Sequence, residues 1–322
     1  MKNIGILIEM EKNEIKSTNA GLITLAGKSL AHLTALIIHG SDAAGTHGQA
    51  REILGKYGVD RVIDISLPSE PEICFNPVVR AEVVASVLEQ YELDTLLGLS
   101  SGQGKDLLPR IAAKMDAPLV MDCMDLDLAQ DIAITSQYSG KTLARIQVTG
   151  ARKIFGIRPN SVSPRENTKE PEVVTLSLAP AVPENFRIIP SETSNARESE
   201  GFSLADADII ISGGRGMKSG ENFSILFACA KKLKAVVGAS RVAVDNDWIP
   251  YAHQVGQTGE KVSPSVYIAC GISGSVQHFA GMKTAKMIIA VNQDEKAAIV
   301  ANSDYYVIGD LFEIIPELTR ML

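Results

Sequence analysis

The chain has 322 residues, of which 45% are hydrophobic, 21% charged and only 5% aromatic, and its formal net charge is −7 at pH 7. A length above that of a usual single core predicts two domains, and the negative charge excludes a general nucleic-acid binder, which would carry a basic face. Aliphatic runs with few aromatic residues are typical of strands that are buried on both faces of a parallel sheet.

The cysteines and the apolar stretches bear on the cellular compartment. Cys74, Cys123, Cys229 and Cys270 lie far apart, so their spacing fits neither a zinc site nor a redox or iron–sulfur motif. We expect isolated buried thiols in a reducing compartment and no metal site. The apolar stretch at residues 4–8 is too short for a signal peptide, and no run approaches the roughly 18 apolar residues of a membrane span. We therefore expect a cytoplasmic protein without direct membrane insertion.

The first half of the chain alternates short aliphatic runs with helical patterns. We expect strands at residues 4–8, 33–38, 61–65 and 95–99, and helices at 16–29 and 79–91. In the second of these helices, apolar residues recur at the spacing of one helical face. Strands that alternate with helices predict βαβ units and a mainly parallel sheet flanked by helices.

Two segments end this first half. Gly104-Lys105 after the strand at 95–99 suggests a phosphate-binding P-loop, but Leu99 stands where the first glycine is required and Asp106 replaces the serine or threonine. Nucleotide hydrolysis is therefore not expected there. From about residue 158 to 203, six prolines interrupt the pattern. We place the domain boundary near residue 200, which divides the chain into domains at 1–200 and 201–322.

The second half resumes the alternation. We expect strands at 207–211, 266–270, 287–291 and 305–308, and helices at 221–234, 276–286 and 311–322. This pattern predicts a doubly wound α/β domain, in which ligands bind at the carboxyl ends of the strands.

The loop at 212–220 is the first candidate site. Its glycines allow an anion to approach the backbone, and Arg215 can add a bidentate contact to a phosphate. An ordinary NAD site is disfavoured, because Ser219 occupies the third glycine position and no acidic residue follows about 20 positions later.

Further polar residues follow the later strands. Ser273, Gly274 and Ser275 lie between a strand and a helix and form a candidate phosphate cradle. His278 lies one turn into that helix, where a satisfied core histidine is the simpler interpretation. Arg241, which follows Ser240, is equally compatible with a surface salt bridge. The candidate site also includes residues of the tight turn before the strand at 266–270 and two that follow later strands. They are Val255, Gly256, Gln257, Thr258, Asn292 and Asp310, the last of which also suits a helix N-cap.

The succession SGGRG, GASR, VGQTG, GISGSVQHFAGM, VNQD and DLFEIIPEL resembles the FAD-binding domain of electron transfer flavoprotein alpha subunits. The likeness covers residues 207–322 almost continuously and implies a Rossmann-like FAD-binding domain. Residues 1–200 are similar, more diffusely, to the first domain of the same family, most clearly at 100–114. The resemblance implies a degenerate nucleotide-hydrolase-like α/β domain there, which ends in a proline-rich linker and packs against a partner subunit.

The resemblance also implies one FAD per chain, with no catalytic residue and no metal. Its pyrophosphate and ribityl contacts fall on Arg215, Ser240, Ser273, Gly274 and Ser275, and its adenosine contacts on Asn292, Asp310 and Leu311. Around the isoalloxazine lie Arg241, Val255, Gly256, Gln257, Thr258 and His278, with Val276 and Gln277 as further cofactor-binding residues.

Three of these residues would tune the flavin. One-electron reduction places negative charge on the ring near N1 and O2, and Arg241, His278 and, toward N5, Thr258 would stabilise the anion. We expect His278 by itself to be neutral near pH 7, because a helix N-terminus disfavours the imidazolium.

The implied function is that of an electron carrier and not of an enzyme. Such a chain is the FAD-holding alpha subunit of a heterodimer with a beta subunit, in which AMP or a second FAD is expected. It accepts electrons from acyl-CoA or related dehydrogenases, as in fatty acid beta-oxidation, and passes them to an electron transfer flavoprotein–quinone oxidoreductase or a similar acceptor. Two alternatives stay open: the alpha subunit of an electron-bifurcating flavoprotein, and a self-contained flavoenzyme.

Overall fold

The computed structural model describes residues 2–11, 14–41, 47–138, 142–180 and 203–322. The chain forms two compact units, of which the first includes Met1–Ser136 and Leu143–Ser194 and the second Gln137–Thr142 and Asn195–Leu322. The boundary predicted near residue 200 lies outside the described residues.

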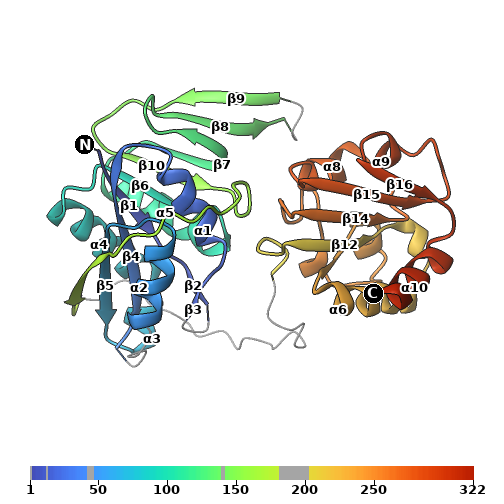
Figure 1. Ribbon diagram of the computed structural model, residues 1–322, viewed down its shortest axis with the longest axis horizontal. Helices are drawn as coiled ribbons and strands as arrows, with labels where there is room; N and C mark the ends of the chain where they lie inside the picture. The colour runs from blue at the N-terminus through green and yellow to red at the C-terminus, as the bar shows by residue number, and fades with distance from the viewer. Residues whose placement is uncertain (1, 12–13, 42–46, 139–141, 181–202) are drawn as a thin grey trace. The chain divides into compact units, whose positions relative to one another are not determined.

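A large sheet forms the centre of the first unit (Figure 1). Within the described residues it has nine strands in the order β11-β5-β4-β1-β6-β10-β7-β8-β9. Neighbouring strands are parallel from β11 to β7, and β8 is antiparallel to β7. The strands are β1 (Lys2–Leu7), β4 (Ala31–Gly40), β5 (Arg61–Leu67), β6 (Thr95–Leu99), β7 (Leu119–Asp127), β8 (Ile132–Gln137), β9 (Thr142–Gln147), β10 (Lys153–Ile157) and β11 (Glu172–Ser177).

Helices cover both faces of this sheet because its strands are apolar on both faces. One apolar cluster joins Ile4 and Ile6 of β1 to α1 (Asn19–Ala26) and α2 (His47–Lys56). The other joins Leu7 to α4 (Pro77–Gln90) and α5 (Gly102–Lys114). The remaining elements of this unit are α3 (Pro71–Cys74) and a two-stranded hairpin of β2 (Met10–Glu11) and β3 (Glu14–Ile15).

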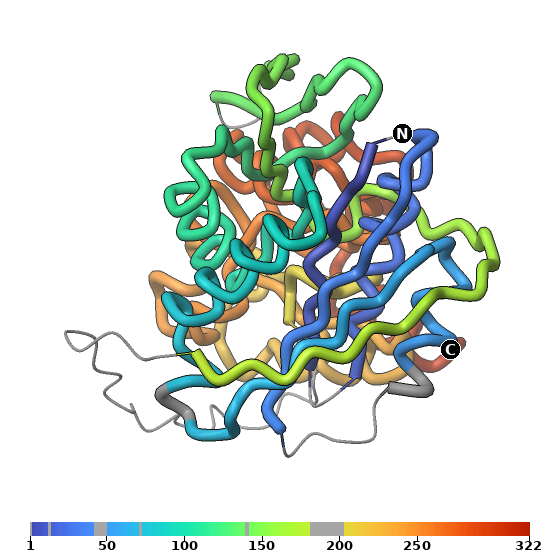
Figure 2. Tube along the Cα trace, turned by 90° about the vertical axis from the view of Figure 1, so that its left-hand side faces the viewer, coloured from blue at the N-terminus to red at the C-terminus, as the bar shows by residue number. Residues whose placement is uncertain are grey.

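β11 was not predicted, since it lies within the segment that the prolines were expected to interrupt. Figure 2 shows this strand, in yellow-green, along the edge of the sheet, where it pairs with β5. Pro171 and Pro180 flank the strand and do not lie inside it, so no proline interrupts its ladder with β5. The strands β7 to β10 were also missed.

The P-loop-like segment has a packing role. Ser101 is the N-cap of α5 and accepts a hydrogen bond from the Gly104 amide at 3.0 Å, while its hydroxyl donates to the buried carboxylate of Glu9. A Cβ at Gly104 would lie 1.7 Å from the Leu99 carbonyl oxygen. The glycine therefore allows α5 to approach the end of β6 closely, which is a structural reason for its presence.

Asn19 ties the end of β1 to α1, and its loss should destabilise the first unit. This fully buried side chain donates to the carbonyls of Glu9 and Lys16 and accepts from the Glu9 amide. Asn19→Ala would leave buried backbone groups unpaired, so we expect a loss of about 2 kcal/mol in the free energy of unfolding. The exposed Asn167, replaced by alanine, is the control and should change it by less than about 0.5 kcal/mol.

Urea-dependent hydrogen exchange of the β1 and α1 peptides measures this quantity in the first unit specifically. Equal protection in Asn19→Ala and Asn167→Ala would show that the three hydrogen bonds do not stabilise the unit.

The second unit is a smaller parallel sheet with helices on both faces. In its described part, five strands follow the order β13-β12-β14-β15-β16. They are β12 (Ile209–Gly213), β13 (Val236–Ala239), β14 (Val266–Cys270), β15 (Met287–Asn292) and β16 (Tyr305–Ile308). The helices are α6 (Ser224–Leu233), α7 (Arg241–Asp245), α8 (Val276–Met282), α9 (Ala298–Ala301) and α10 (Leu311–Met321), with short 3-10 turns at Arg215–Met217, Glu221–Phe223 and Tyr251–His253.

Two apolar clusters line the faces of this sheet. One packs α6 and α10 against it through Leu226 and Ile315, and the other packs α8 and α9 through Met282 and Ile299. The predicted fold class, two mainly parallel sheets flanked by helices, is confirmed. Across the described residues, no helix is long and apolar enough to cross a membrane, and the four cysteines are buried thiols outside any disulfide.

Candidate functional site

The strand order of the second sheet creates a crevice between β12 and β14. The chain passes from β12 to β13 on one side and then returns to β14 on the other side of β12. At such a switch point the loops that follow the two strands diverge, and ligands of α/β sheets bind in the space between them. Gly213 at the end of β12 pairs with Cys270 at the end of β14, so both loops begin at the same level.

The two loops touch backbone to backbone. The amides of Gly214 and Gly216 donate to the carbonyls of Cys270 and Gly271, both at 2.9 Å. A Cβ at Gly214 would lie 2.4 Å from the Gly271 oxygen, and one at Gly216 would lie 2.7 Å from the Gly271 Cα. Only glycine permits this contact, which places the backbone of both loops along one wall of the crevice.

The predicted phosphate cradle is held in place by α9. Gly274 has φ +78°, and a Cβ there would lie 2.3 Å from the Ile299 nitrogen. The Ile299 amide donates to the Ser273 carbonyl at 3.2 Å, and Ser275 caps α8 by accepting from the His278 amide at 3.4 Å. The cradle is therefore a fixed turn whose shape depends on a left-handed glycine.

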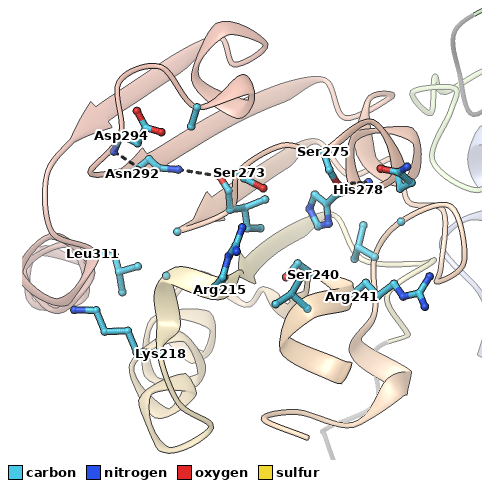
Figure 3. A pocket seen from close by; sticks show the side chains of 18 of the residues that line it. Arg215, Lys218, Ser240, Arg241, Ser273, Ser275, His278, Asn292, Asp294 and Leu311 are labelled. Carbon is cyan, nitrogen blue, oxygen red and sulfur yellow. Dashed lines mark hydrogen bonds between the residues drawn. The ribbon is translucent and has the colours of Figure 1, made fainter. Parts of the chain in front are cut away.

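These loops surround a cavity of about 680 Å³, within the range of cofactor sites. Figure 3 shows the Arg215 side chain in its middle, with Ser275 and His278 to one side and Asn292 and Leu311 to the other. Of the residues predicted for the site, Gly274 and Val276 do not line the cavity. Those that do are Arg215, Ser240, Arg241, Val255, Gly256, Gln257, Thr258, Ser273, Ser275, Gln277, His278, Asn292, Asp310 and Leu311.

The cavity wall also contains polar residues that were not among the individual residues predicted for the site. They are Lys218, Asp245, Gln254, Gln293 and Asp294. Each lies within a few positions of a predicted residue, so their proximity in the chain is the signal that could have found them. Asp245 in particular lies one helical turn after Arg241 and forms an ion pair with it at 3.2 Å.

At the edge near β15 and β16, two predicted residues have structural partners. Asn292 donates to the Ile272 carbonyl at 2.8 Å and accepts from the Asp294 amide at 3.0 Å, so it links the loops after β14 and β15. Asp310 is the N-cap of α10 and accepts from the Phe312 amide at 2.9 Å. The N-cap interpretation of Asp310 is therefore right, and the residue lines the cavity as well.

The turn that contains Gly256 is docked on the start of α8. The Gln257 amide donates to the Gln277 carbonyl at 2.8 Å, and the Thr258 hydroxyl accepts from the Gln254 side chain at 3.1 Å. Arg241 differs from these residues because its side chain is 66% exposed, on the short helix α7. The salt-bridge interpretation and the cavity position of Arg241 thus both hold.

His278 is buried and is neutral at pH 7. Burial lowers the pKa of its imidazole to about 4, and the nearby backbone of Val255 opposes this only in part. The cause differs from the one expected from the sequence, since burial and not the helix N-terminus dominates. Nε2 lies 3.0 Å from the Tyr267 hydroxyl, and Nδ1 has no hydrogen bond of standard geometry to any described residue.

The site therefore combines a glycine-lined anion cradle with a basic residue, Arg215, and an imidazole with an unused ring nitrogen. These features fit a flavin dinucleotide, whose pyrophosphate needs the cradle and whose ring offers hydrogen-bond acceptors. In the described part of the chain, no group of three or more His, Cys, Asp or Glu side chains could hold a metal ion.

Comparison with known proteins agrees with this geometry. The chain matches an electron transfer flavoprotein domain over residues 4–181 and an electron transfer flavoprotein FAD-binding domain over residues 203–283. It is 34% identical over 318 residues to the electron transfer flavoprotein subunit alpha of Mycobacterium leprae, covering 98% of this chain and 96% of the relative. Its identity to the Bacillus subtilis subunit alpha is 36% over 275 residues, with 84% and 82% coverage. A probable mitochondrial subunit alpha of Caenorhabditis elegans is 33% identical over 318 residues, with 98% and 92% coverage.

Proposed function

This chain belongs to the electron transfer flavoprotein alpha-subunit family, and from that membership we propose that it holds one FAD in the cavity of its second unit. It is an electron carrier rather than an enzyme, and it contains a FAD-binding domain. The observation that carries the proposal is the convergence of the loops after β12, β13, β14, β15 and β16 on one cavity.

The lining residues divide by chemistry. Arg215 and the amides of residues 272–275 would bind the pyrophosphate, because a cation and N–H groups that point at a ligand favour an anion. Asn292, Asp310 and Leu311 would lie at the adenosine end. Gly274 supports the site without lining it, since its left-handed backbone shapes the cradle.

Bound FAD supplies the one-electron redox chemistry. Arg241 contributes a cation at the cavity wall, and Thr258, which also lines the cavity, contributes a hydroxyl. His278 contributes a neutral imidazole whose Nδ1 is unused. Such groups favour negative charge on the isoalloxazine where it develops on reduction.

The partners follow from the same proposal. Residues 1–200 would pack against an electron transfer flavoprotein beta subunit, in which AMP or a second FAD is bound, and residues 201–322 would hold the FAD of this chain. The heterodimer would take electrons from acyl-CoA or related dehydrogenases in the cytoplasm and pass them to a quinone oxidoreductase or a similar acceptor.

Flavin content and the route of reduction test this function. The chain is purified with its beta subunit, the flavin-to-AMP ratio is measured, and the FAD absorbance is followed with an acyl-CoA dehydrogenase and its substrate. Reduction that requires the dehydrogenase supports a carrier, whereas reduction by the organic substrate alone would identify a self-contained flavoenzyme. A second flavin in the beta subunit in place of AMP would identify the bifurcating type.

Arg241→Ala is expected to lower the first reduction potential of bound FAD by about 60 mV or more, with the fold intact. A lost charge-assisted interaction of about 1.5 kcal/mol corresponds to this shift for one electron. The exposed position of Arg241 on α7 makes a stability effect small. Arg241→Lys should restore only part of the potential, because a point charge does not reproduce the planar guanidinium.

Spectroelectrochemical titration measures the potential. Arg320→Ala is the matched control, since this arginine is also exposed and ion-paired, with Glu317 on α10, and it does not line the cavity. Identical first reduction potentials in Arg241→Ala and Arg320→Ala would show that Arg241 does not stabilise the reduced flavin.

A further inference from the structure

Tyr267 is a buried polar side chain that the proposed site does not use. It lies in β14, fully buried, within the apolar cluster that α8 and α9 cover. A phenol oxygen in an apolar layer is costly unless it is hydrogen-bonded. Its partner is His278, with 3.0 Å between the hydroxyl and Nε2 and an edge-type arrangement of the rings.

The hydrogen bond restricts the protonation of the histidine. A neutral imidazole has one N–H donor and one acceptor nitrogen. If the Tyr267 hydroxyl donates to Nε2, the ring proton must be on Nδ1. If Nε2 donates to the hydroxyl, Nδ1 is a bare acceptor.

The surroundings of the phenol favour a proton on Nδ1. Among the described residues, the Tyr267 hydroxyl has one hydrogen bond of standard geometry, to Nε2 of His278, and the buried hydroxyl of Ser212 makes no such bond. If Nε2 carried the ring proton, the buried O–H of Tyr267 would have no acceptor, which is costly in an apolar layer. When Tyr267 donates to Nε2, its O–H is satisfied and the ring proton is on Nδ1.

Burial supports the same direction. It raises the pKa of Tyr267 well above the usual value, so the phenol keeps its proton near neutral pH. β14 is hydrogen-bonded to a strand on each side, β12 and β15, and thus holds the phenol on a rigid element.

We propose that Tyr267 is a positioning residue that donates to Nε2 of His278 and holds the ring in the tautomer with its proton on Nδ1. Nδ1 is then the free donor of a side chain that lines the cavity. A carbonyl or ring nitrogen of the flavin could accept a hydrogen bond from Nδ1–H. In the opposite tautomer Nδ1 carries no proton, and its lone pair would face the lone pair of the flavin acceptor. This consequence rests on the proposed function, whereas the tautomer itself does not.

The tautomer is measured by 15N NMR on the heterodimer labelled at histidine, with and without FAD. The chain has five histidines, and the signal missing from His278→Gln identifies the one in question. We expect a protonated Nδ1 and a bare Nε2, and a mixture of tautomers in Tyr267→Phe, which keeps the ring and loses only the hydroxyl. Tyr305→Phe, at an exposed position of β16, is the control and should leave the signal unchanged. A protonated Nε2 in the unmodified protein, or an unchanged tautomer in Tyr267→Phe, would overturn the proposal.

The redox readout separates positioning from a structural effect. In Tyr267→Phe we expect the preference of the site for reduced over oxidised FAD to fall about tenfold, or about 60 mV for one electron. In the His278→Gln background, Tyr267→Phe should not change the potential, because Tyr267 is expected to act on the flavin only through the imidazole of His278. Equal losses in both backgrounds would overturn the proposal. If the protein binds no FAD at all, the proposed function fails, but the tautomer remains measurable.

Discussion

Replacing Gly274 with alanine is expected to weaken FAD binding about 100-fold or more, or about 3 kcal/mol. A non-glycine residue at φ +78° costs about 1–2 kcal/mol, and the added Cβ would also lie 2.3 Å from the Ile299 nitrogen and 2.7 Å from its Cα. Both atoms belong to the backbone of α9, so neither can move aside cheaply. The loop that carries Ser273 and Ser275 must therefore shift, and the cradle loses its shape.

Titration of the FAD-free heterodimer with FAD measures this loss, and circular dichroism checks the fold. Gly309→Ala is the control, because it adds the same methyl group to another glycine of the cavity wall. There the Cβ would meet only the end of the Ile314 side chain, at 2.9 Å. We expect its affinity to stay within about tenfold of the unmodified protein, since one flexible side chain can adjust at a cost of about 1 kcal/mol. An unchanged affinity in Gly274→Ala would show that the cradle does not bind the cofactor.

Acid should destabilise the second unit by about 3 kcal/mol between pH 7 and pH 4 through His278 alone. Burial lowers the pKa of this residue from 6.5 to about 4 in the folded protein. As the pH falls through 6.5, the unfolded chain therefore binds a proton that the folded chain does not, and the free energy of unfolding decreases. The decrease ends near pH 4, where the folded protein also becomes protonated. A difference of one pKa unit corresponds to about 1.4 kcal/mol, so a lowering from 6.5 to about 4 corresponds to about 3 kcal/mol.

The single tryptophan, Trp248, lies in the second unit and packs against its core, so its fluorescence reports the unfolding of that unit. The experiment compares denaturant titrations of the FAD-free protein at several pH values with those of His278→Gln. The variant should lose most of the decrease between pH 6.5 and 4, whatever its absolute stability. His32→Gln, a substitution on β4 of the first unit, is the control and should behave like the unmodified protein. Parallel pH profiles in His278→Gln and the control would contradict a buried neutral imidazole.

Some of this site could be predicted from sequence because its signals are local. Strands at 266–270 and 305–308 begin and end where the apolar runs do. Glycine and serine clusters after the strands marked most of the loops that form the cavity, since parallel strands carry such loops to one edge of the sheet. The elements that were missed have weaker local signals: β11 lies between prolines, and it is a strand because it pairs with β5, more than 100 positions earlier.

The sequence by itself determined the family, the alternation of strands and helices in much of the chain, and many of the residues that line the cavity. Only the tertiary structure decided what several of these residues do. Gly104 has the spacing of a phosphate loop but serves the close packing of α5 against β6. Tyr267 is an aromatic residue of a buried strand in the sequence, and its hydrogen bond to His278, 11 positions later, exists because β14 and α8 meet in space. The pKa and the hydrogen-bond partner of a side chain depend on burial and on neighbours from other elements, and neither is contained in a local pattern.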